Sequence, residues 1–300
     1  MSIACEFDYV RPESWKAALE ALREEGAWAL AGGSDLIAWL RDGVVQPKVV
    51  VDLKGLEGMK GIERDGKGVW MGGGTTFAEV LESEAVKKAA PALWEGAGMV
   101  ASVGVRNRAT VAGNVCSAVP CCDAGPGLLV HGAVMVVRTR SGKKEIPIEG
   151  WFKGPRKTAL PKGGIVEGIR LPGSGGKMGA AFAKLKRYRG EDLAQASGAA
   201  VVDGRGNWRI ALGSVGPVPY LAEKTAAVLK GCKAPDEKLL EKVAKVAEEE
   251  ARPITDIRAS AEYRRLMVGV MAKRAAALAA RRLAGEGPEY GFNCMEEEEA

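Results

Sequence analysis

Two glycine-rich turns, each between a short apolar strand and a helical segment, constrain this chain more than any other feature. The first turn, Gly32-Gly33-Ser34-Asp35, follows the apolar residues 27–31. The second, 72–76, follows 69–71 and precedes a helix predicted over 77–90, which Thr76 and Glu79 begin with a capping box. Glycines allow close backbone approach, and successive N–H groups at such a turn can hold an anion. A single copy is explained equally well by an ordinary strand-to-helix turn.

A further glycine-rich stretch, 98–119, is predicted to be extended and changes that balance. Within it, residues 106–114 combine permissive backbone with Arg106, Arg108 and Asn114, which can meet a pyrophosphate from the other side. Surface ion pairing is the alternative for the two arginines. Asp123, nine residues beyond Asn114, is a carboxylate suited to ribose hydroxyls. Neither the Walker pattern nor the GxGxxG fingerprint occurs at these turns.

The chain length and the counts of glycine and histidine limit the kinds of reaction that this chain can carry out. With 300 residues the chain is expected to form two or three subdomains. Glycine occurs 40 times, well above the usual share, whereas His131 is the only histidine. One histidine excludes multi-histidine metal sites and most metallohydrolases. We therefore expect a bound cofactor to carry the chemistry.

Charge and cysteine usage limit partners and compartment. The net charge of +5 rises to +9 without the glutamates at 296–299, so the body is basic. No arginine stripe with interleaved aromatics and no zinc-finger spacing occurs, which argues against nucleic acid. The six cysteines show no secreted-disulfide pattern, and neither a signal peptide nor a membrane span is visible. The sequence predicts a soluble, cytoplasmic protein.

The order of strands and helices divides the chain into units 1–57, 58–176 and 177–285, with a loose acidic tail over 286–300. A Pro/Gly/Ser-rich break at 172–176 separates the second unit from the third. In the third unit, predicted strands precede predicted helices, an order typical of an α+β domain. The expected elements are a helix at 12–25; strands at 49–53, 134–138, 144–148, 165–171, 178–185, 196–202 and 208–212; an apolar or helical patch at 128–131; and helices at 221–229, 236–249 and 260–284.

Four segments in order carry a resemblance to a known family: 31–35, 72–76, 105–114 and Gly213-Ser214-Val215-Gly216-Pro217. Together they are similar to the FAD-binding (medium) subunit of the molybdenum hydroxylases, which include xanthine dehydrogenases, aerobic carbon monoxide dehydrogenase and 4-hydroxybenzoyl-CoA reductase. The resemblance spans about residues 5–285. It implies an α+β chain: a two-part FAD-binding domain of the vanillyl-alcohol-oxidase (PCMH) type, made of two α/β subdomains, plus a C-terminal α+β domain.

The resemblance also implies the cofactor, FAD, and its contacts. Residues 29–35 would wrap the pyrophosphate and flank the isoalloxazine, 110–114 would form a second pyrophosphate loop, and Asp123 would contact the adenosine part. Asp35 either binds a ribityl hydroxyl or caps a helix. Lys184 either stabilises reduced flavin or is a solvated strand lysine, and Tyr188 either shields the ring or packs elsewhere. The residues implied to bind FAD are Ala29, Leu30, Ala31, Gly32, Gly33, Ser34, Asp35, Thr110, Ala112, Gly113, Asn114, Ser117, Asp123, Val166, Glu167, Lys184 and Tyr188.

The implied function is electron transfer within an oxidoreductase complex. A large subunit would hold the molybdenum cofactor, a small subunit would hold [2Fe–2S] clusters, and FAD would pass electrons to NAD⁺ or another acceptor, in a dimer of heterotrimers. A self-standing FAD oxidoreductase and a flavin-less scaffold subunit are the alternatives. Cys116, Cys121 and Cys122 do not match ferredoxin spacings, and a fourth ligand would have to be Cys5, Cys232 or Cys294, so buried thiols are expected instead of a cluster. His131 is expected at the edge of the core.

Overall fold

The N-terminal unit is a small parallel sheet with two helices. The computed structural model describes residues 3, 5–173, 175–188 and 190–291. The strand order is β1-β3-β2, and the central strand is apolar on both faces, as parallel strands covered on both sides usually are. The helix predicted at 12–25 is shorter, because Ser14 caps it only at Trp15. The elements of this unit are β1 (Asp8–Val10), α1 (Trp15–Ala21), β2 (Ala27–Leu30), α2 (Ser34–Arg41), β3 (Val49–Asp52) and the short η1 (Leu53–Gly55).

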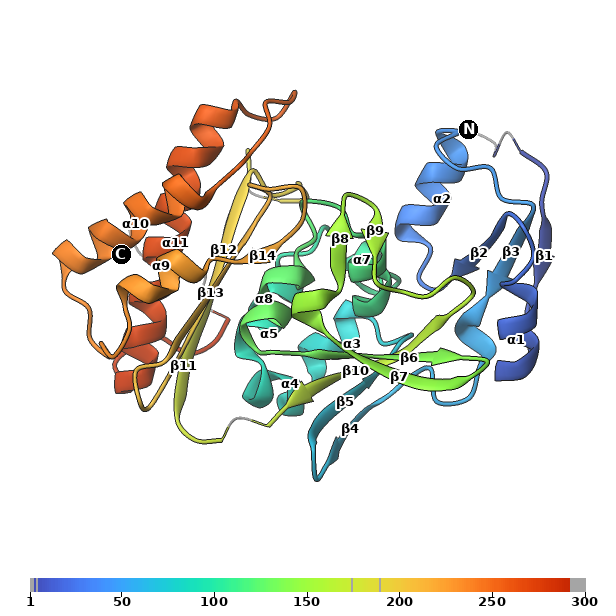
Figure 1. Cartoon of the computed structure of the whole chain (residues 1–300), viewed down its shortest axis with the longest axis horizontal. Helices are drawn as coiled ribbons and strands as arrows, with labels where there is room; N and C mark the ends of the chain where they lie inside the picture. Colours follow the sequence, from blue (N-terminus) through green and yellow to red (C-terminus); the bar gives the residue numbers. More distant parts are fainter. Residues whose placement is uncertain (1–2, 4, 174, 189, 292–300) are drawn as a thin grey trace.

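The second unit contains an antiparallel sheet of order β4-β5-β10-β6-β7, in the middle of the molecule (Figure 1). The resemblance implied an α/β unit here, in which the sheet would be parallel, and that part of the expectation is wrong. The cause is local: a tight turn after Asp65, whose carboxylate accepts from Lys67 N–H at 2.8 Å, joins β4 to β5, and such turns join only antiparallel strands. The strands are β4 (Ile62–Asp65), β5 (Gly68–Gly72), β6 (Val134–Thr139), β7 (Gly142–Pro147) and β10 (Ile165–Pro172), with η2 (Ile148–Gly150) and the hairpin β8 (Phe152–Gly154) and β9 (Lys157–Thr158) before β10.

The helices of this unit differ most from expectation. The predicted helix 77–90 is two helices, because Ser83 ends one and caps the next. The capping box of Thr76 and Glu79 is confirmed. The stretch 98–119 is mainly helical and not extended, since Ser102 and Thr110 cap short helices that its glycines do not prevent. The helices are α3 (Phe77–Glu82), α4 (Glu84–Ala89), α5 (Pro91–Gly98), α6 (Val103–Arg106), α7 (Val111–Ser117) and α8 (Ala124–Val130).

The C-terminal unit is a four-stranded antiparallel sheet between two layers of helices (Figure 1). The helices α10 and α11 cover one face, while α5 and α8 of the second unit pack on the other. A Cβ on Gly179 would lie 1.9 Å from the Ala279 carbonyl oxygen, so this glycine allows α11 its close approach to the sheet. The predicted strands and the two long helices are confirmed as β11 (Met178–Leu185), β12 (Ala196–Asp203), β13 (Trp208–Gly213), α10 (Glu237–Glu250) and α11 (Ala261–Ala284). The helix predicted at 221–229 is shorter, α9 (Glu223–Val228), and an unpredicted short strand, β14 (Tyr220–Leu221), precedes it.

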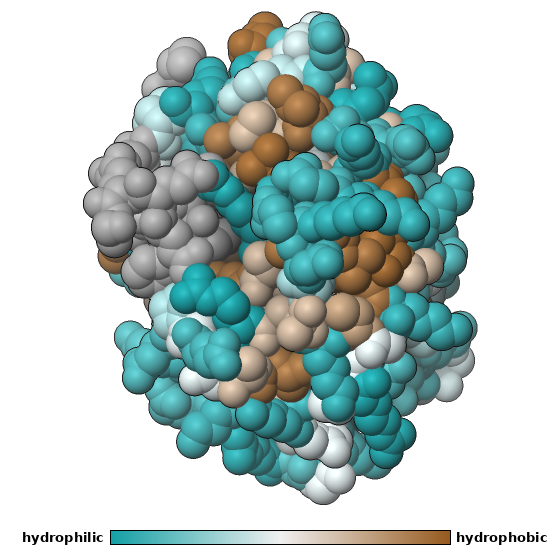
Figure 2. All heavy atoms as spheres, turned by 90° about the vertical axis from the view of Figure 1, so that its left-hand side faces the viewer, coloured by the Kyte–Doolittle hydropathy of each residue, from teal (hydrophilic) through white to brown (hydrophobic). Residues whose placement is uncertain are grey.

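The outer side of this unit is mostly hydrophilic, with scattered apolar patches (Figure 2). Helix α10 is strongly amphipathic: Leu240, Val243 and Ala247 are buried, whereas most of its charged residues are exposed. None of the helices in the described residues combines the length and the apolar run that a membrane span requires.

A buried ion pair joins the second unit to the third. Glu95 on α5 accepts from Arg282 on α11 at 2.7 Å and from the Phe182 N–H on β11 at 3.0 Å. Arg282 also donates to the carbonyl oxygens of Pro288 and Glu289, and Gly291 N–H donates to Glu95. The part of the predicted loose tail at 288–291 is thus packed, because these carbonyl groups complete the hydrogen bonds of a buried guanidinium; 292–300, with Cys294 and Glu296–Glu299, lie outside the described residues.

Candidate functional site

A large cavity lies where the three units meet. Its volume is about 680 Å³, within the range of ligand and cofactor sites. The first unit contributes β2 and the start of α2, the second contributes α7 and the adjacent loops, and the third contributes Arg187, Leu193 and Arg258. The residues implied by resemblance that line this cavity are Ala29, Ala31, Gly32, Gly33, Ser34, Asp35, Thr110, Ala112, Gly113, Asn114, Ser117, Asp123 and Val166.

The first glycine turn is shaped by two backbone requirements. Gly33 precedes α2 with a φ of +81°, a conformation that disfavours other residues. A Cβ on Gly32 would lie 2.0 Å from the Arg108 carbonyl oxygen, so Gly32 lets the two glycine-rich segments touch. Ala29 and Ala31 face the cavity, whereas Leu30 packs into the core beside Leu36, because side chains alternate along a strand.

The other glycine-rich segment at the cavity, residues 106–114, is tied to its surroundings by side-chain hydrogen bonds. Thr110 Oγ1 accepts from Gly113 N–H at 3.0 Å and begins α7. Asn114 Oδ1 accepts from Ala124 N–H at 3.2 Å, which fixes the start of α8. Ser117 Oγ donates to Asp35 Oδ2 at 2.5 Å across the cavity. Asp35 therefore bridges two units and is not a helix cap, since α2 has Gly33 at that position and no side-chain cap.

Asp123 is the polar side chain whose geometry points most clearly to a ligand. It is 7 % exposed and lines the cavity. Its Oδ2 accepts from Lys184 Nζ at 2.7 Å, while its Oδ1 is buried without a hydrogen-bond partner. Burial raises the pKa of Asp123, and the adjacent Lys184 opposes this shift. A buried acceptor without a partner is costly, so a ligand hydroxyl or N–H at Oδ1 would satisfy it.

Four of the implied residues do not line the cavity. Leu30 is in the core, as described above. Glu167 turns away and accepts from Arg138 at 2.8 and 2.9 Å and pairs with Lys143; burial alone would raise its pKa, but these hydrogen bonds lower it. Tyr188 is 55 % exposed, and its hydroxyl donates to the Glu191 carbonyl oxygen.

Lys184 is the fourth, and its position corrects the sequence interpretation. The alternative of a solvated lysine is wrong, because Lys184 is 2 % exposed and donates to Met99 O at 2.9 Å as well as to Asp123. A strand pattern of small residues gives no sign of such burial.

The two arginines of the second segment also differ from expectation. Arg106 donates to the carbonyl oxygens of Val100 and Ala101, at 2.7 and 3.1 Å, and so closes its own loop. Arg108 is exposed. Neither side chain lines the cavity, and within the described residues neither forms an ion pair.

Several cavity residues were missed by sequence reasoning. Trp28 and Trp39, whose ring centroids lie 6.4 Å apart in an edge-to-face arrangement, line the N-terminal side. Arg187, Leu193 and Arg258 line the C-terminal side. The tryptophans flank the first glycine turn, which was a usable signal, but no local pattern marks Arg258.

The thiols and the histidine take structural positions. Burial raises the pKa of Cys116 to about 12 and that of Cys122 well above its usual value. In the part of the chain that the structure describes, no cluster of His, Cys, Asp or Glu is arranged to hold a metal ion. His131 Nε2 accepts from Ala92 N–H at 3.2 Å, and burial lowers its pKa to about 3, so it is neutral.

Comparison with known proteins identifies the family. Residues 5–174 match the model of the FAD binding domain in molybdopterin dehydrogenase, and 180–279 match the CO dehydrogenase flavoprotein C-terminal domain. The carbon monoxide dehydrogenase medium chain of Hydrogenophaga pseudoflava is 32% identical over 90% of this chain and 95% of the relative. The xanthine dehydrogenase FAD-binding subunit of Escherichia coli O157:H7 is 28% identical over 82% and 86%. A solved carbon monoxide dehydrogenase from H. pseudoflava superposes with a TM-score of 0.87, with 31% identity, over 92% of this chain and 98% of that chain.

This chain belongs to the FAD-binding subunits of the molybdenum hydroxylase family. It is an oxidoreductase component with FAD as its cofactor, and the α+β fold expected from the resemblance is confirmed. The cavity fits this cofactor: a dinucleotide carries hydroxyl donors for the orphaned Asp123 Oδ1, and two glycine-rich segments bring backbone close to a phosphate.

Proposed function

We propose that this chain takes electrons from [2Fe–2S] clusters of a small subunit and passes them, through FAD, to NAD⁺ or another acceptor. In this proposal the substrate is oxidised at a molybdenum cofactor in a large subunit. The observation that carries it is the orphaned Asp123 oxygen in a cavity lined by both glycine-rich segments. FAD, when bound, supplies the redox chemistry; the protein binds and orients it.

The proposed binding roles follow from the positions described. The backbone at 32–34 and 112–114 would hold the pyrophosphate, and Asp123 Oδ1 would accept from a hydroxyl or N–H of the cofactor. Asp35 and Ser117 would hold the first two units together around it. Lys184 would act through Asp123, because its ammonium group is already bonded by protein oxygens.

Two observations argue against a self-standing flavin oxidase. His131 lies outside the cavity lining and accepts a backbone N–H, so it is not placed for covalent flavin attachment. Cys116 lines the cavity, but its raised pKa disfavours the nucleophilic thiolate. Residues of both glycine-rich segments line the cavity, which argues against a flavin-less scaffold.

We further propose that the complex is a dimer of heterotrimers in the cytoplasm, and that 1–57, 58–176 and 177–285 are its structural units in this chain. The free thiols of the described cysteines are consistent with a reducing compartment.

The test is purification of the native complex through a tag on this chain, with metal analysis and an absorption spectrum. We expect two further subunits, molybdenum, iron and a flavin spectrum, and reoxidation of the reduced flavin by the physiological acceptor. Turnover of a substrate by the isolated chain would overturn the proposal in favour of a self-standing oxidase. Absence of flavin from the intact complex would favour the scaffold alternative.

A further inference from the structure

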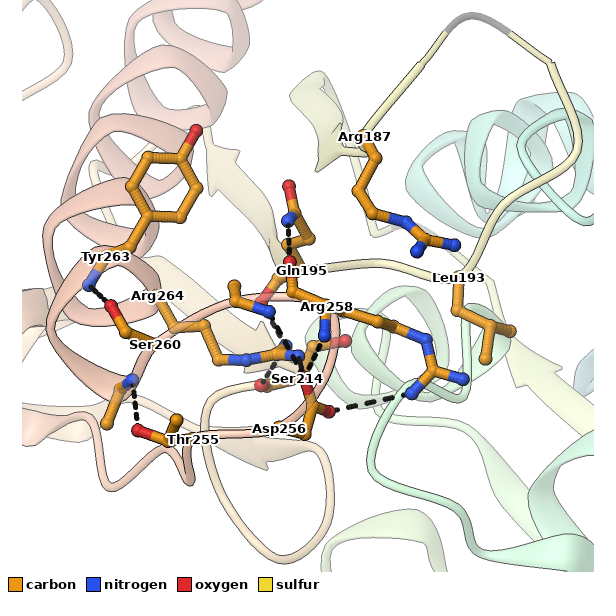
Figure 3. A network of polar contacts seen from close by, with 12 residues as sticks. Arg187, Leu193, Gln195, Ser214, Thr255, Asp256, Arg258, Ser260, Tyr263 and Arg264 are labelled. Atoms are coloured by element: carbon orange, nitrogen blue, oxygen red, sulfur yellow. Dashed lines mark hydrogen bonds and ion pairs between the residues drawn. The ribbon is translucent and has the colours of Figure 1, made fainter.

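The C-terminal wall of the cavity contains a network of charged side chains that the sequence did not reveal (Figure 3). Asp256 is at its centre. It accepts from the guanidinium of Arg264 at 2.7 Å and from the backbone N–H of Arg258 at 2.8 Å. The Arg258 carbonyl in turn accepts from Gln195 Nε2 at 2.7 Å. The backbone at residue 258 is therefore held from both sides.

Arg264 anchors this network in the interior. It is 3 % exposed, and it also donates to the Gln195 carbonyl oxygen at 2.7 Å. The short contacts of Asp256 are with the Arg264 guanidinium and with backbone N–H groups. Its contact with the Arg258 guanidinium is longer, at 3.5 Å. The carboxylate thus fixes where Arg258 begins but neutralises its charge only weakly.

The other cation of this wall is neutralised much more fully. Arg187 forms two hydrogen bonds to Asp192, at 2.9 and 3.0 Å, and these lower the pKa of Asp192 below its usual range. Figure 3 shows Arg187 and Arg258 on either side of Leu193, and all three residues line the cavity. Among the described residues that line the cavity, Arg258 is the cation with the weaker internal partner.

Cys121, which also lines the cavity, lies near Arg258. Burial is the main cause of the raised pKa of Cys121; the Asp123 charge adds to this effect and the Arg258 charge opposes it. The Arg258 side chain remains one-third exposed, at 32%, and so lies at the rim of the cavity and not in the core. A ligand group beside Arg258 would therefore meet an oriented positive charge whose ion pair with Asp256 is long, at 3.5 Å.

We propose that Arg258 is the cation that faces the electron-carrying ring of the bound flavin and favours its reduced, anionic form. This inference rests on the proposed function. The pyrophosphate is assigned to the glycine-rich segments, which leaves the reduced ring as the remaining anionic part of the cofactor. A fixed cation binds an anionic form better than a neutral one and thereby raises the reduction potential. Arg258 takes the role that the family resemblance implied for Lys184, whose charge is already paired with Asp123.

The test is the flavin midpoint potential of the assembled complex carrying Arg258→Met, measured by equilibration with redox dyes. We expect the preference for reduced over oxidised flavin to fall about tenfold, which lowers the potential of a two-electron couple by about 30 mV. Arg258→Lys keeps the charge and should retain most of the potential. Arg187→Met is the matched control on the same wall, and it should change the potential much less because Asp192 already neutralises that charge.

The outcomes separate this inference from the proposed function. If Arg258→Met binds flavin with an unchanged potential, Arg258 does not face the ring. Weaker FAD binding at an unchanged potential would place Arg258 on the pyrophosphate, and a higher KM for the acceptor alone would place it on the acceptor; both overturn the inference and leave the proposed function intact. A complex of the unsubstituted chain that contains no flavin would instead overturn the proposed function.

Discussion

The two sides of the cavity are built in different ways. The N-terminal side presents backbone at the glycines where two segments touch, beside Trp28 and Trp39. The C-terminal side presents side chains held by ion pairs. A backbone wall fixes shape and tolerates few added atoms. A side-chain wall tolerates substitution but determines the charge that the ligand meets. We therefore expect that mutations can change the binding of FAD and its reduction potential separately.

The largest effect on FAD binding is expected at the backbone wall. In Gly32→Ala the new Cβ would lie 2.0 Å from the Arg108 carbonyl oxygen, which forces the two segments apart. We expect a loss of about 3 kcal/mol in the free energy of unfolding and loss of bound FAD. Thermal unfolding and flavin content measure both. Gly104→Ala is the control, because nothing lies within 4 Å of its Cβ position. Equal behaviour of the two variants would show that the wall is not rigid.

The next effect concerns the ion pair that joins the two sides. Lys184→Met leaves Asp123 as a buried, unpaired carboxylate, which should cost about 3–5 kcal/mol of stability. The double variant Asp123→Asn/Lys184→Met removes both charges and should recover part of that loss. Chemical denaturation of the set gives the coupling energy. A double variant as unstable as the sum of the single ones would mean that the pair is not coupled.

A smaller effect is expected where Asp35 meets Ser117. Ser117→Ala removes a hydrogen bond to a charged group and should cost about 1.5–3 kcal/mol, and it should weaken FAD binding by loosening the N-terminal unit. Hydrogen exchange of α2 should accelerate while that of α11 stays unchanged. Faster exchange in both helices would indicate global destabilisation instead.

The smallest effect at neutral pH belongs to His131, behind the cavity. Its pKa in the folded chain is about 3 against 6.5 when exposed, because burial disfavours its charged form. Between these values the unfolded chain binds more protons, so stability should fall as the pH falls through this window, by about 1.4 kcal/mol per pH unit. His131→Gln should remove that part of the slope. As the only histidine, His131 gives a single imidazole NMR signal, whose titration FAD should leave unchanged.

The sequence predicted what the backbone determines. Strand–turn–helix units, the capping box of Thr76 and Glu79, and the cavity-lining glycine segments all have short local patterns. The helices at 103–106 and 111–117 were missed because the glycine content of 98–119 suggested extended chain, whereas Ser102 and Thr110 cap helices there. The central place of β10 in the second sheet depends on pairing between strands far apart in sequence, which local patterns do not report.

The side-chain wall was not predictable for a related reason. The local sequence around Lys184 is that of a solvated lysine on a strand. Its burial depends on Asp123, 61 residues away. Arg258 depends on Asp256, whose position depends on Arg264 in a later helix. Such roles arise only when the third unit packs against the second.

Helix α11 has a mechanical consequence for the whole chain. Arg264 and Arg282 stand eighteen residues apart on it, which is five full turns, so both project from the same face about 27 Å apart. One anchors the cavity network through Gln195, and the other holds α5 through Glu95. The helix is therefore a stiff beam fastened at both ends. A shift of α11 along its axis would break the contacts of both arginines, so the position of the cavity network is tied to that of α5.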